Sequence, residues 1–184
     1  MANKFVDANY RYIAAYQEVN ARISQRQQAL ALYLTLVVSL LAALVALRPA
    51  PGGAMAPVEW LIVGFPVASF ALALMNYTSE RAISNLRTFL SGLERLENAH
   101  LELPSYNTEP RWSSAANKAR RYRDLATCLF VIAGNAMGLG AAWKIYPDRL
   151  AEYAWFMWGS VTLAVGSILV LLITQRFSYR PATG

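Results

Sequence analysis

Hydrophobic residues gather in four blocks of the chain, and polar residues fill the stretches between them. The blocks cover residues 29–47, 58–77, 125–143 and 154–174, with Glu59 at the edge of the second block and Pro66 inside it. A helix rises about 1.5 Å per residue, so roughly 20 apolar residues cross a hydrocarbon core of about 30 Å. Each block has about this length. The pattern predicts an all-α integral membrane protein with four transmembrane helices.

The first block differs from a cleaved secretory signal. Its uncharged run is longer than the roughly 7–15 apolar residues of such signals, and a polar segment of 28 residues precedes it. We therefore expect residues 29–47 to be a membrane anchor.

The distribution of Lys and Arg predicts the orientation of the chain. Fourteen of these residues lie in segments 1–27, 78–124 and 175–184, whereas only Arg48, Lys144 and Arg149 lie in the remaining connections. Cytoplasmic loops of membrane proteins carry such an excess of positive charge. We expect both termini and the middle segment to be cytoplasmic, and the Ala-, Arg- and Gln-rich composition is typical of a bacterial inner membrane protein. Tryptophans that would anchor the opposite interface agree: Trp60, Trp143, Trp155 and Trp158.

Residues 1–27 contain no Gly or Pro and are predicted to form a cytoplasmic amphipathic helix. One helical face carries apolar side chains at spacings of seven, four, three and four, namely Phe5, Tyr12, Tyr16, Val19 and Ile23. Such a helix can lie on the membrane surface or pack against other cytoplasmic helices. Its polar face mixes both charge signs, which favours packing.

The middle segment, residues 78–124, is predicted to be a cytoplasmic helical hairpin that extends spans two and three. Its first half repeats apolar residues at 4-3-4-3 spacing, typical of a coiled-coil stripe of about two heptads: Ala82, Leu86, Phe89, Leu93 and Leu96. Pro104 and Pro110 bracket the expected turn. Residues 175–184 form the cytoplasmic tail. Tyr12, Tyr16 and Ile23, together with Leu86, Phe89, Leu93 and Leu96, are candidates for packing or for partner contacts.

The third block is rich in small residues. Gly134 and Gly138 form a small-xxx-small pair that lets helix backbones approach closely, and Ala141 continues this face. Asn135 needs an interhelical partner or a wet cavity. We expect these four residues to pack inside the bundle or at a contact between subunits, or to border a pore formed on assembly.

Four basic residues precede the third block: Lys118, Arg120, Arg121 and Arg123. They are candidates for binding anionic lipid or another anionic ligand, and the alternative is an ordinary positively charged flank. No glycine-rich phosphate loop accompanies them, and direct nucleic-acid binding is not expected.

The composition excludes several kinds of disulfide and cofactor site. Hydrophobic residues make up 56% of the chain and charged residues 15%, the net charge is +6, and there is one Cys and one His. One cysteine excludes an internal disulfide, and one histidine excludes bis-histidine haem ligation. Glu59 and Asp124 stand at the ends of spans, where an interfacial position is the simplest interpretation. We expect no cofactor, no bound metal and no catalytic residues.

These features favour a non-enzymatic, homo-oligomeric membrane protein that acts as a sensor, scaffold or docking platform for a soluble cytoplasmic partner. The alternative is an oligomeric ion channel or membrane-permeabilising effector with the third span near the pore. This alternative rests on a general resemblance to small helical membrane effectors of bacterial defence systems, without a diagnostic motif. A weaker alternative is binding of lipid or a small hydrophobic molecule in the bundle.

Overall fold

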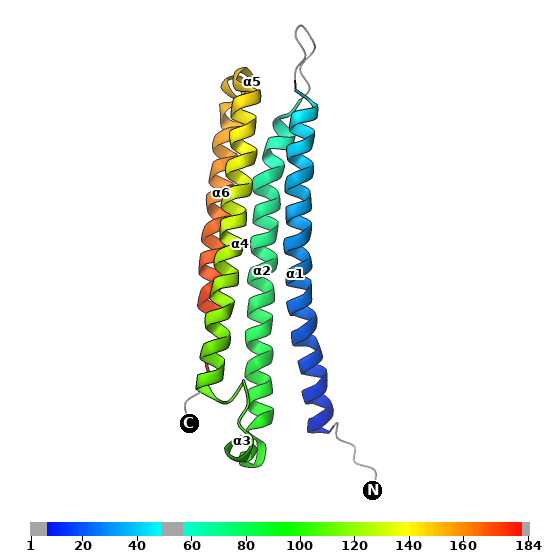
Figure 1. The fold of residues 1–184 in the computed structure, drawn as a ribbon, viewed down its shortest axis with the longest axis vertical. Helices are drawn as coiled ribbons and strands as arrows, with labels where there is room; N and C mark the ends of the chain where they lie inside the picture. Colours follow the sequence, from blue (N-terminus) through cyan, green and yellow to red (C-terminus); the bar gives the residue numbers. More distant parts are fainter. Residues whose placement is uncertain (1–6, 49–56, 182–184) are drawn as a thin grey trace.

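Four long helices run side by side along the length of the molecule (Figure 1). The computed structural model describes residues 7–48 and 57–181, and within these ranges it contains helices and no strands. The long helices are α1 (Ala8–Ala46), α2 (Glu59–Glu94), α4 (Pro110–Ile145) and α6 (Ala154–Thr174). All four are long and apolar enough to cross a membrane, which confirms the prediction of an all-helical chain with four membrane-compatible helices.

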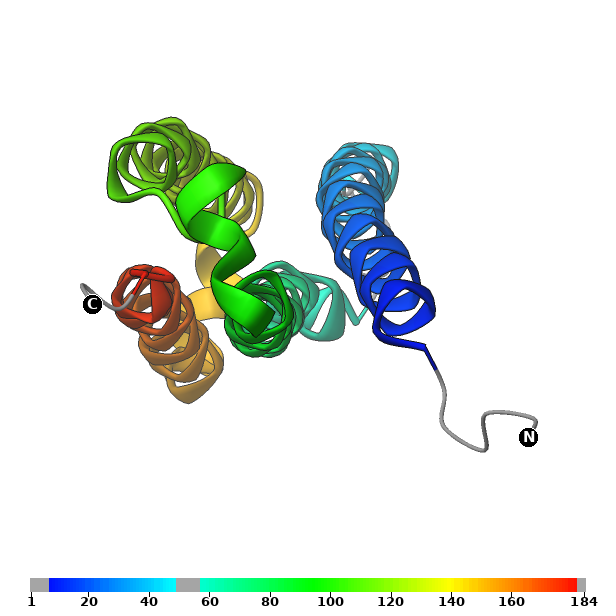
Figure 2. The ribbon, with the colours of Figure 1, turned by 90° about the horizontal axis from the view of Figure 1, so that it is seen from below.

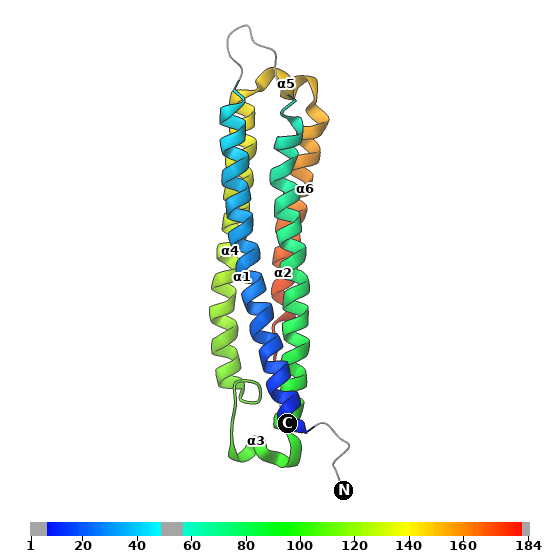
Figure 3. The same ribbon diagram turned by 90° about the vertical axis from the view of Figure 1, so that its right-hand side faces the viewer.

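Short elements connect the long helices at the two ends of the bundle. At one end, η1 (Leu96–Asn98) and α3 (Ala99–Glu102) lead from α2 to α4, and α1 begins near this end (Figure 3). At the other end, α5 (Pro147–Glu152) joins α4 to α6. A last turn, η2 (Gln175–Phe177), follows α6. We call these two ends the α3 end and the α5 end.

Local sequence features mark where the helices begin and end. The Asp7 carboxylate accepts a hydrogen bond from the backbone N–H of Asn9 at 3.2 Å and caps α1. Pro110 opens α4, where its missing N–H costs nothing. Glu97 and Asn98 have φ angles of 53° and 62°, and this left-handed backbone ends the run that α2 began.

The apolar core follows α2, which packs against α1 on one side and α6 on the other (Figure 2). Fully buried side chains that include Leu44, Phe65 and Val131 form a continuous core between α1, α2 and α4. A second, smaller cluster joins α1 to α2 at the α3 end through Ala15, Val19, Ile83 and Leu90.

Three of the apolar blocks lie inside longer helices. α1 is unbroken from Ala8 to Ala46, so the predicted segments 1–27 and 29–47 share one helix, and Phe5 lies outside the described residues. α2 and α4 likewise extend past their blocks toward the α3 end. The expected stripe on α2 shifts by one residue: Ile83 and Leu90 are buried, whereas Phe89 is 47% exposed. Leu96 falls beyond the end of α2, in η1, and is half exposed.

Candidate functional site

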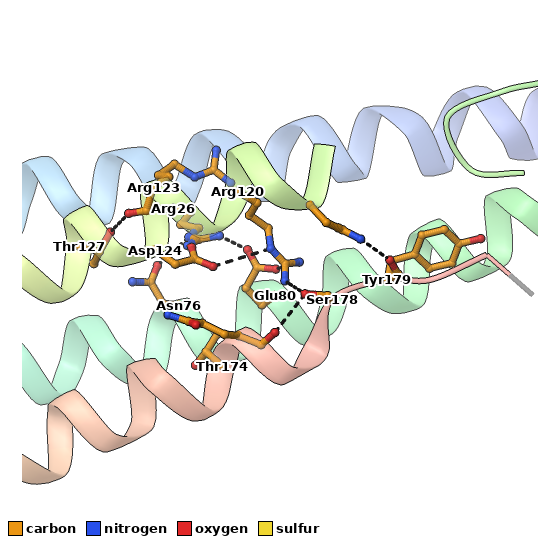
Figure 4. Close-up of polar contacts among 12 residues, drawn as sticks. Arg26, Asn76, Glu80, Arg120, Arg123, Asp124, Thr127, Thr174, Ser178 and Tyr179 are labelled. Atoms are coloured by element: carbon orange, nitrogen blue, oxygen red, sulfur yellow. Dashed lines mark hydrogen bonds and ion pairs between the residues drawn. The ribbon is translucent and has the colours of Figure 1, made fainter. Parts of the chain in front are cut away.

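A group of buried polar side chains ties three helices together where the apolar blocks end, and we call it the Arg26 cluster (Figure 4). It consists of Arg26 from α1, Asn76 and Glu80 from α2, and Arg120 and Asp124 from α4. The guanidinium of Arg26 donates to the Asn76 Oδ1 at 3.0 Å and pairs with both carboxylates. Arg120 donates from Nη1 to the Glu80 Oε2 at 2.7 Å, and its Nε lies 3.7 Å from the Asp124 Oδ2.

Helical spacing brings these side chains to one level of the bundle. Asn76 and Glu80 stand four residues apart on α2, and Arg120 and Asp124 stand four residues apart on α4, so each pair shares one face of its helix. Arg26 lies three residues before the first apolar block. The apolar blocks of the three helices cross the same thickness, whichever way each helix runs. The polar turn next to each block therefore lies at the same height in the bundle.

The Arg26 cluster is deeply buried and its charges balance. Arg26, Glu80 and Asp124 are 8%, 1% and 5% exposed, and two guanidinium groups face two carboxylates. Buried ions lose their hydration, and such a pair is held only when geometry and extra hydrogen bonds compensate. Removing one partner of such a pair costs about 3–5 kcal/mol. The cluster therefore fastens α1, α2 and α4 to one another.

The segment after α6 is attached to the same region. Arg120 donates from Nη2 to the Ser178 Oγ at 2.6 Å, and the Asn117 amide donates to the Tyr179 carbonyl at 2.8 Å. The Tyr179 hydroxyl donates to the Asn107 carbonyl at 2.7 Å, and the guanidinium of Arg87 lies 4.8 Å from the centre of the Tyr179 ring. These contacts hold the C-terminal segment between α4 and the loop that follows α3.

An open cleft lies beside the Arg26 cluster on its α3-end side. It has a volume of about 680 Å³ and is lined by α1, α2, α4 and the loop before α4. Apolar and aromatic side chains alternate with charged ones in its lining, which includes Tyr12, Tyr16, Val19, Asn20, Ile23, Glu80, Ile83, Arg87, Leu90, Glu94, Trp112, Asn117, Arg120 and Arg123. This volume lies within the roughly 300–1,000 Å³ of ligand pockets. We call it the α3-end cleft.

The lining of the α3-end cleft is partly fixed and partly free. The Tyr12 hydroxyl donates to the Glu94 Oε1 at 3.0 Å, whereas Tyr16 is 53% exposed. Arg87 donates to the Asn107 Oδ1 at 3.2 Å at the same end. An occupant of the cleft would meet an apolar wall, aromatic rings and positioned charges, which suits an amphipathic ligand or protein segment. Among the described residues no three His, Cys, Asp or Glu side chains gather to hold a metal ion.

The small-xxx-small pair of the third apolar block, Gly134 and Gly138, faces the inside of the bundle. A Cβ on Gly134 would lie 2.6 Å from the Tyr33 hydroxyl, and a Cβ on Gly138 would lie 2.5 Å from the Phe65 ring. Asn135 is also buried, and Ala141 is half-buried. Both glycines therefore allow large aromatic side chains of α1 and α2 to approach α4.

Asn135 belongs to a short chain of hydrogen bonds in the apolar region. Its Nδ2 donates to the Ser69 Oγ at 2.7 Å and to the Val131 carbonyl at 2.8 Å. The Ser69 Oγ lies 3.2 Å from the Tyr33 hydroxyl, so the chain connects α4, α2 and α1. The Asn135 Oδ1 is buried and has no hydrogen-bond partner within the described part of the chain.

The four basic candidates separate in the structure. Arg120 enters the Arg26 cluster, whereas Lys118, Arg121 and Arg123 are exposed. Arg123 lines the α3-end cleft, and Lys118 and Arg121 face a different hollow on α4. A run of basic residues on one helix points in several directions because successive residues turn by about 100°.

The packing candidates also separate. Tyr12, Ile23 and Leu86 pack around the small cluster that joins α1 to α2, and Leu93 is half-buried. Tyr16, Phe89 and Leu96 remain exposed and are available for contacts with another molecule.

Sequence reasoning did not identify Arg26, Asn76 and Glu80, and it interpreted Asp124 as an interfacial residue. The sequence did contain a signal for this cluster, because each of the three helices has a charged side chain within one turn of its apolar block. At the α5 end Glu59 lies 3.7 Å from Arg149, which agrees with its position at the end of α2.

No protein-family model, no curated protein and no solved structure matches this chain. Its function is therefore inferred from its own residues.

Proposed function

We propose that this chain is a non-enzymatic integral membrane protein whose α3 end faces the cytoplasm and docks a soluble protein partner. Four membrane-compatible helices support this arrangement, as do the fourteen Lys and Arg residues in segments 1–27, 78–124 and 175–184 against three in the remaining connections. The Ala-, Arg- and Gln-rich composition supports a bacterial inner membrane as its location.

The observation that carries the docking role is the apolar surface of the α3 end. Side chains there are strongly exposed although they lie outside the four apolar blocks, where lipid tails would not cover them in the proposed orientation. They are Tyr10, Ile13, Tyr16, Leu101, Leu103, Tyr106 and Trp112, which are 44–76% exposed. Exposed apolar side chains that neither lipid nor core covers favour an interaction site. Tyr16, Tyr106 and Trp112 also line the α3-end cleft, so the cleft and this surface form one docking region.

The docking region connects directly to the helix arrangement. Glu80 and Arg120 line the cleft and also hold the Arg26 cluster. Arg120 is the more accessible of the two, with a side chain that is 11% exposed. A partner that contacts Arg120 would therefore change the fastening of α1, α2 and α4, which is how a docking platform can also act as a sensor.

Site-specific photo-crosslinking in native membranes tests this proposal. A photoreactive amino acid at Tyr16 should crosslink a discrete soluble protein, and the same group at the neighbouring exposed Gln17, which is not among the cleft-lining residues, should not. The identified protein should then bind purified wild-type chain and lose affinity for Tyr16→Arg. Equal crosslinking at both positions, or crosslinks to lipid alone, would refute the docking role.

The proposed homo-oligomer would use the outward face of α4. Ala133, Ala136 and Gly140 are exposed at spacings of three and four, and nothing lies within 4 Å of a Cβ on Gly140. Small exposed residues let a second copy approach closely. Gly140→Leu should shift the protein toward monomers in mild detergent, whereas Gly159→Leu on α6, where a Cβ also meets nothing within 4 Å, should not.

The alternative function is an oligomeric ion channel or membrane-permeabilising effector. The small exposed face of α4 favours it, because copies meeting along this face would place α4 beside their common axis. Gly134, Asn135 and Gly138 would then support the pore-bordering helix from behind, since they are buried within one chain. Ion flux through reconstituted liposomes that Gly140→Leu abolishes would establish this alternative, and an absence of flux at every protein density would exclude it.

A further inference from the structure

A second hollow at the α3 end is lined only by basic, hydroxyl, amide and proline residues. It lies between α4 and the C-terminal segment, has a volume of about 550 Å³, and is lined by Pro110, Ser113, Ser114, Asn117, Lys118, Arg121, Arg180 and Pro181. Three of these residues are cationic and none is acidic. We propose that this hollow, the basic concavity, binds a soluble phosphate-bearing ligand.

The three cations are not used by the fold. Lys118, Arg121 and Arg180 are exposed, and none of them forms an ion pair within residues 7–48 and 57–181. Arg120 and Arg22, by contrast, pair with carboxylates. A concave surface lined by one sign of charge concentrates counter-ions. Guanidinium and ammonium groups are the usual protein ligands of phosphate oxygens.

The position of Arg180 is fixed by its neighbours. The Asn117 amide holds the Tyr179 carbonyl at 2.8 Å, and the Tyr179 hydroxyl holds the Asn107 carbonyl at 2.7 Å. The Arg120 guanidinium holds the Ser178 hydroxyl at 2.6 Å. The backbone leading to Arg180 is therefore attached to α4 before any ligand arrives, which lowers the ordering cost of binding.

The height of the basic concavity favours a soluble ligand over a lipid headgroup. Counted from the start of the apolar block at Leu125, Arg121 lies about 6 Å away, Lys118 about 10 Å and Pro110 about 22 Å, at about 1.5 Å per residue. The headgroup layer adds only about 5–8 Å on each side of the hydrocarbon core. In the proposed topology the backbone of Arg121 lies within that layer, and the backbones of Lys118 and Pro110 lie beyond it. This part of the inference rests on the proposed function.

Titration calorimetry with tripolyphosphate as the probe tests the basic concavity in detergent-purified protein at low salt. We expect saturable binding to the wild-type chain that weakens as salt is added. The double variant Lys118→Gln/Arg121→Gln should lose roughly ten- to a hundredfold in affinity, because each charge-assisted contact contributes strongly. The matched double variant Arg11→Gln/Arg81→Gln removes two exposed charges that are not among the lining residues and should bind within about threefold of wild type.

Three results would overturn the proposal. Absent binding of tripolyphosphate and of anionic lipid would show that the hollow holds no phosphate site. An equal loss in both double variants would show that the hollow is only part of a general positive field. Binding of phosphatidylglycerol nanodiscs that depends on Lys118 and Arg121, without any tripolyphosphate binding, would show a headgroup site instead. The assay uses no protein partner, so its failure leaves the Tyr16 crosslinking test of the docking role unaffected.

Discussion

Removing the charge of Arg26 should destabilise the bundle far more than removing an exposed charge on the same helix. In Arg26→Met, the Asn76 Oδ1 loses its donor and two buried carboxylates share the single guanidinium of Arg120, whose Nε lies 3.7 Å from the Asp124 Oδ2. Uncompensated buried charge of this kind costs about 3–5 kcal/mol. At about 2–4 °C per kcal/mol for a chain of this size, the melting temperature should fall by roughly 6–20 °C.

Two further variants serve as a control and as a test of charge balance. Arg22→Met removes a cation one turn away whose pair with Glu18 is about 40% exposed, so it should cost about 0–1 kcal/mol. Arg26→Met/Asp124→Asn restores charge balance and keeps the contact between Arg120 and Glu80, so it should be more stable than Arg26→Met alone.

Thermal unfolding in one mild detergent, followed by circular dichroism, compares the wild type, Arg26→Met, Arg22→Met, Asp124→Asn and the double variant. An Arg26→Met variant that melts no lower than Arg22→Met would refute the fastening role of the Arg26 cluster. A double variant whose loss equals the sum of the losses of Arg26→Met and Asp124→Asn would refute it as well, because coupling through the cluster requires non-additivity.

Three substitutions test the packing elsewhere in the bundle. Gly138→Ala should destabilise the protein by about 1–3 kcal/mol because the new Cβ would lie 2.5 Å from the Phe65 ring, whereas Gly140→Ala meets nothing within 4 Å and should melt at or above the wild-type temperature. Tyr146→Phe removes the hydrogen bond of 2.8 Å to the Leu44 carbonyl and leaves a buried acceptor without a donor in the last turn of α1. This should lower the unfolding free energy by about 1–3 kcal/mol. An unchanged melting curve would show that this carbonyl finds another donor.

Hydropathy was sufficient to predict the helices because each apolar block contains enough consecutive apolar residues to cross a bilayer. The all-helical chain and its four membrane-compatible helices followed from that property alone. The one-residue shift of the buried stripe on α2 could not be predicted in the same way. Ala82, Phe89 and Ile83 are all compatible with an apolar face, and packing against Ala15 and Val19 of α1 buries Ile83 and Leu90.

The Arg26 cluster could not be predicted from the sequence of any one helix. Each of its charges has an ordinary explanation by itself, since Arg and Asp often flank membrane helices. Only the contact of three helices shows that Arg26, Glu80 and Asp124 neutralise one another. For the glycines of the third block, the sequence indicated the kind of contact but not its partner. Gly134 and Gly138 correctly indicated close packing, but Tyr33 and Phe65 of the same chain satisfy it, so these glycines do not require a second copy.

The orientation of the α3 end tests the whole account most directly, because the docking region and the basic concavity both have to face the cytoplasm. The single native cysteine, Cys128, is buried, so Cys128→Ser gives a background for single-cysteine labelling. Ser114→Cys at the α3 end and Asp148→Cys at the α5 end are both exposed positions. A membrane-impermeant maleimide should label Asp148→Cys in intact spheroplasts and should label Ser114→Cys only after the membrane is opened. Labelling of Ser114→Cys from outside, with Asp148→Cys protected, would contradict the account.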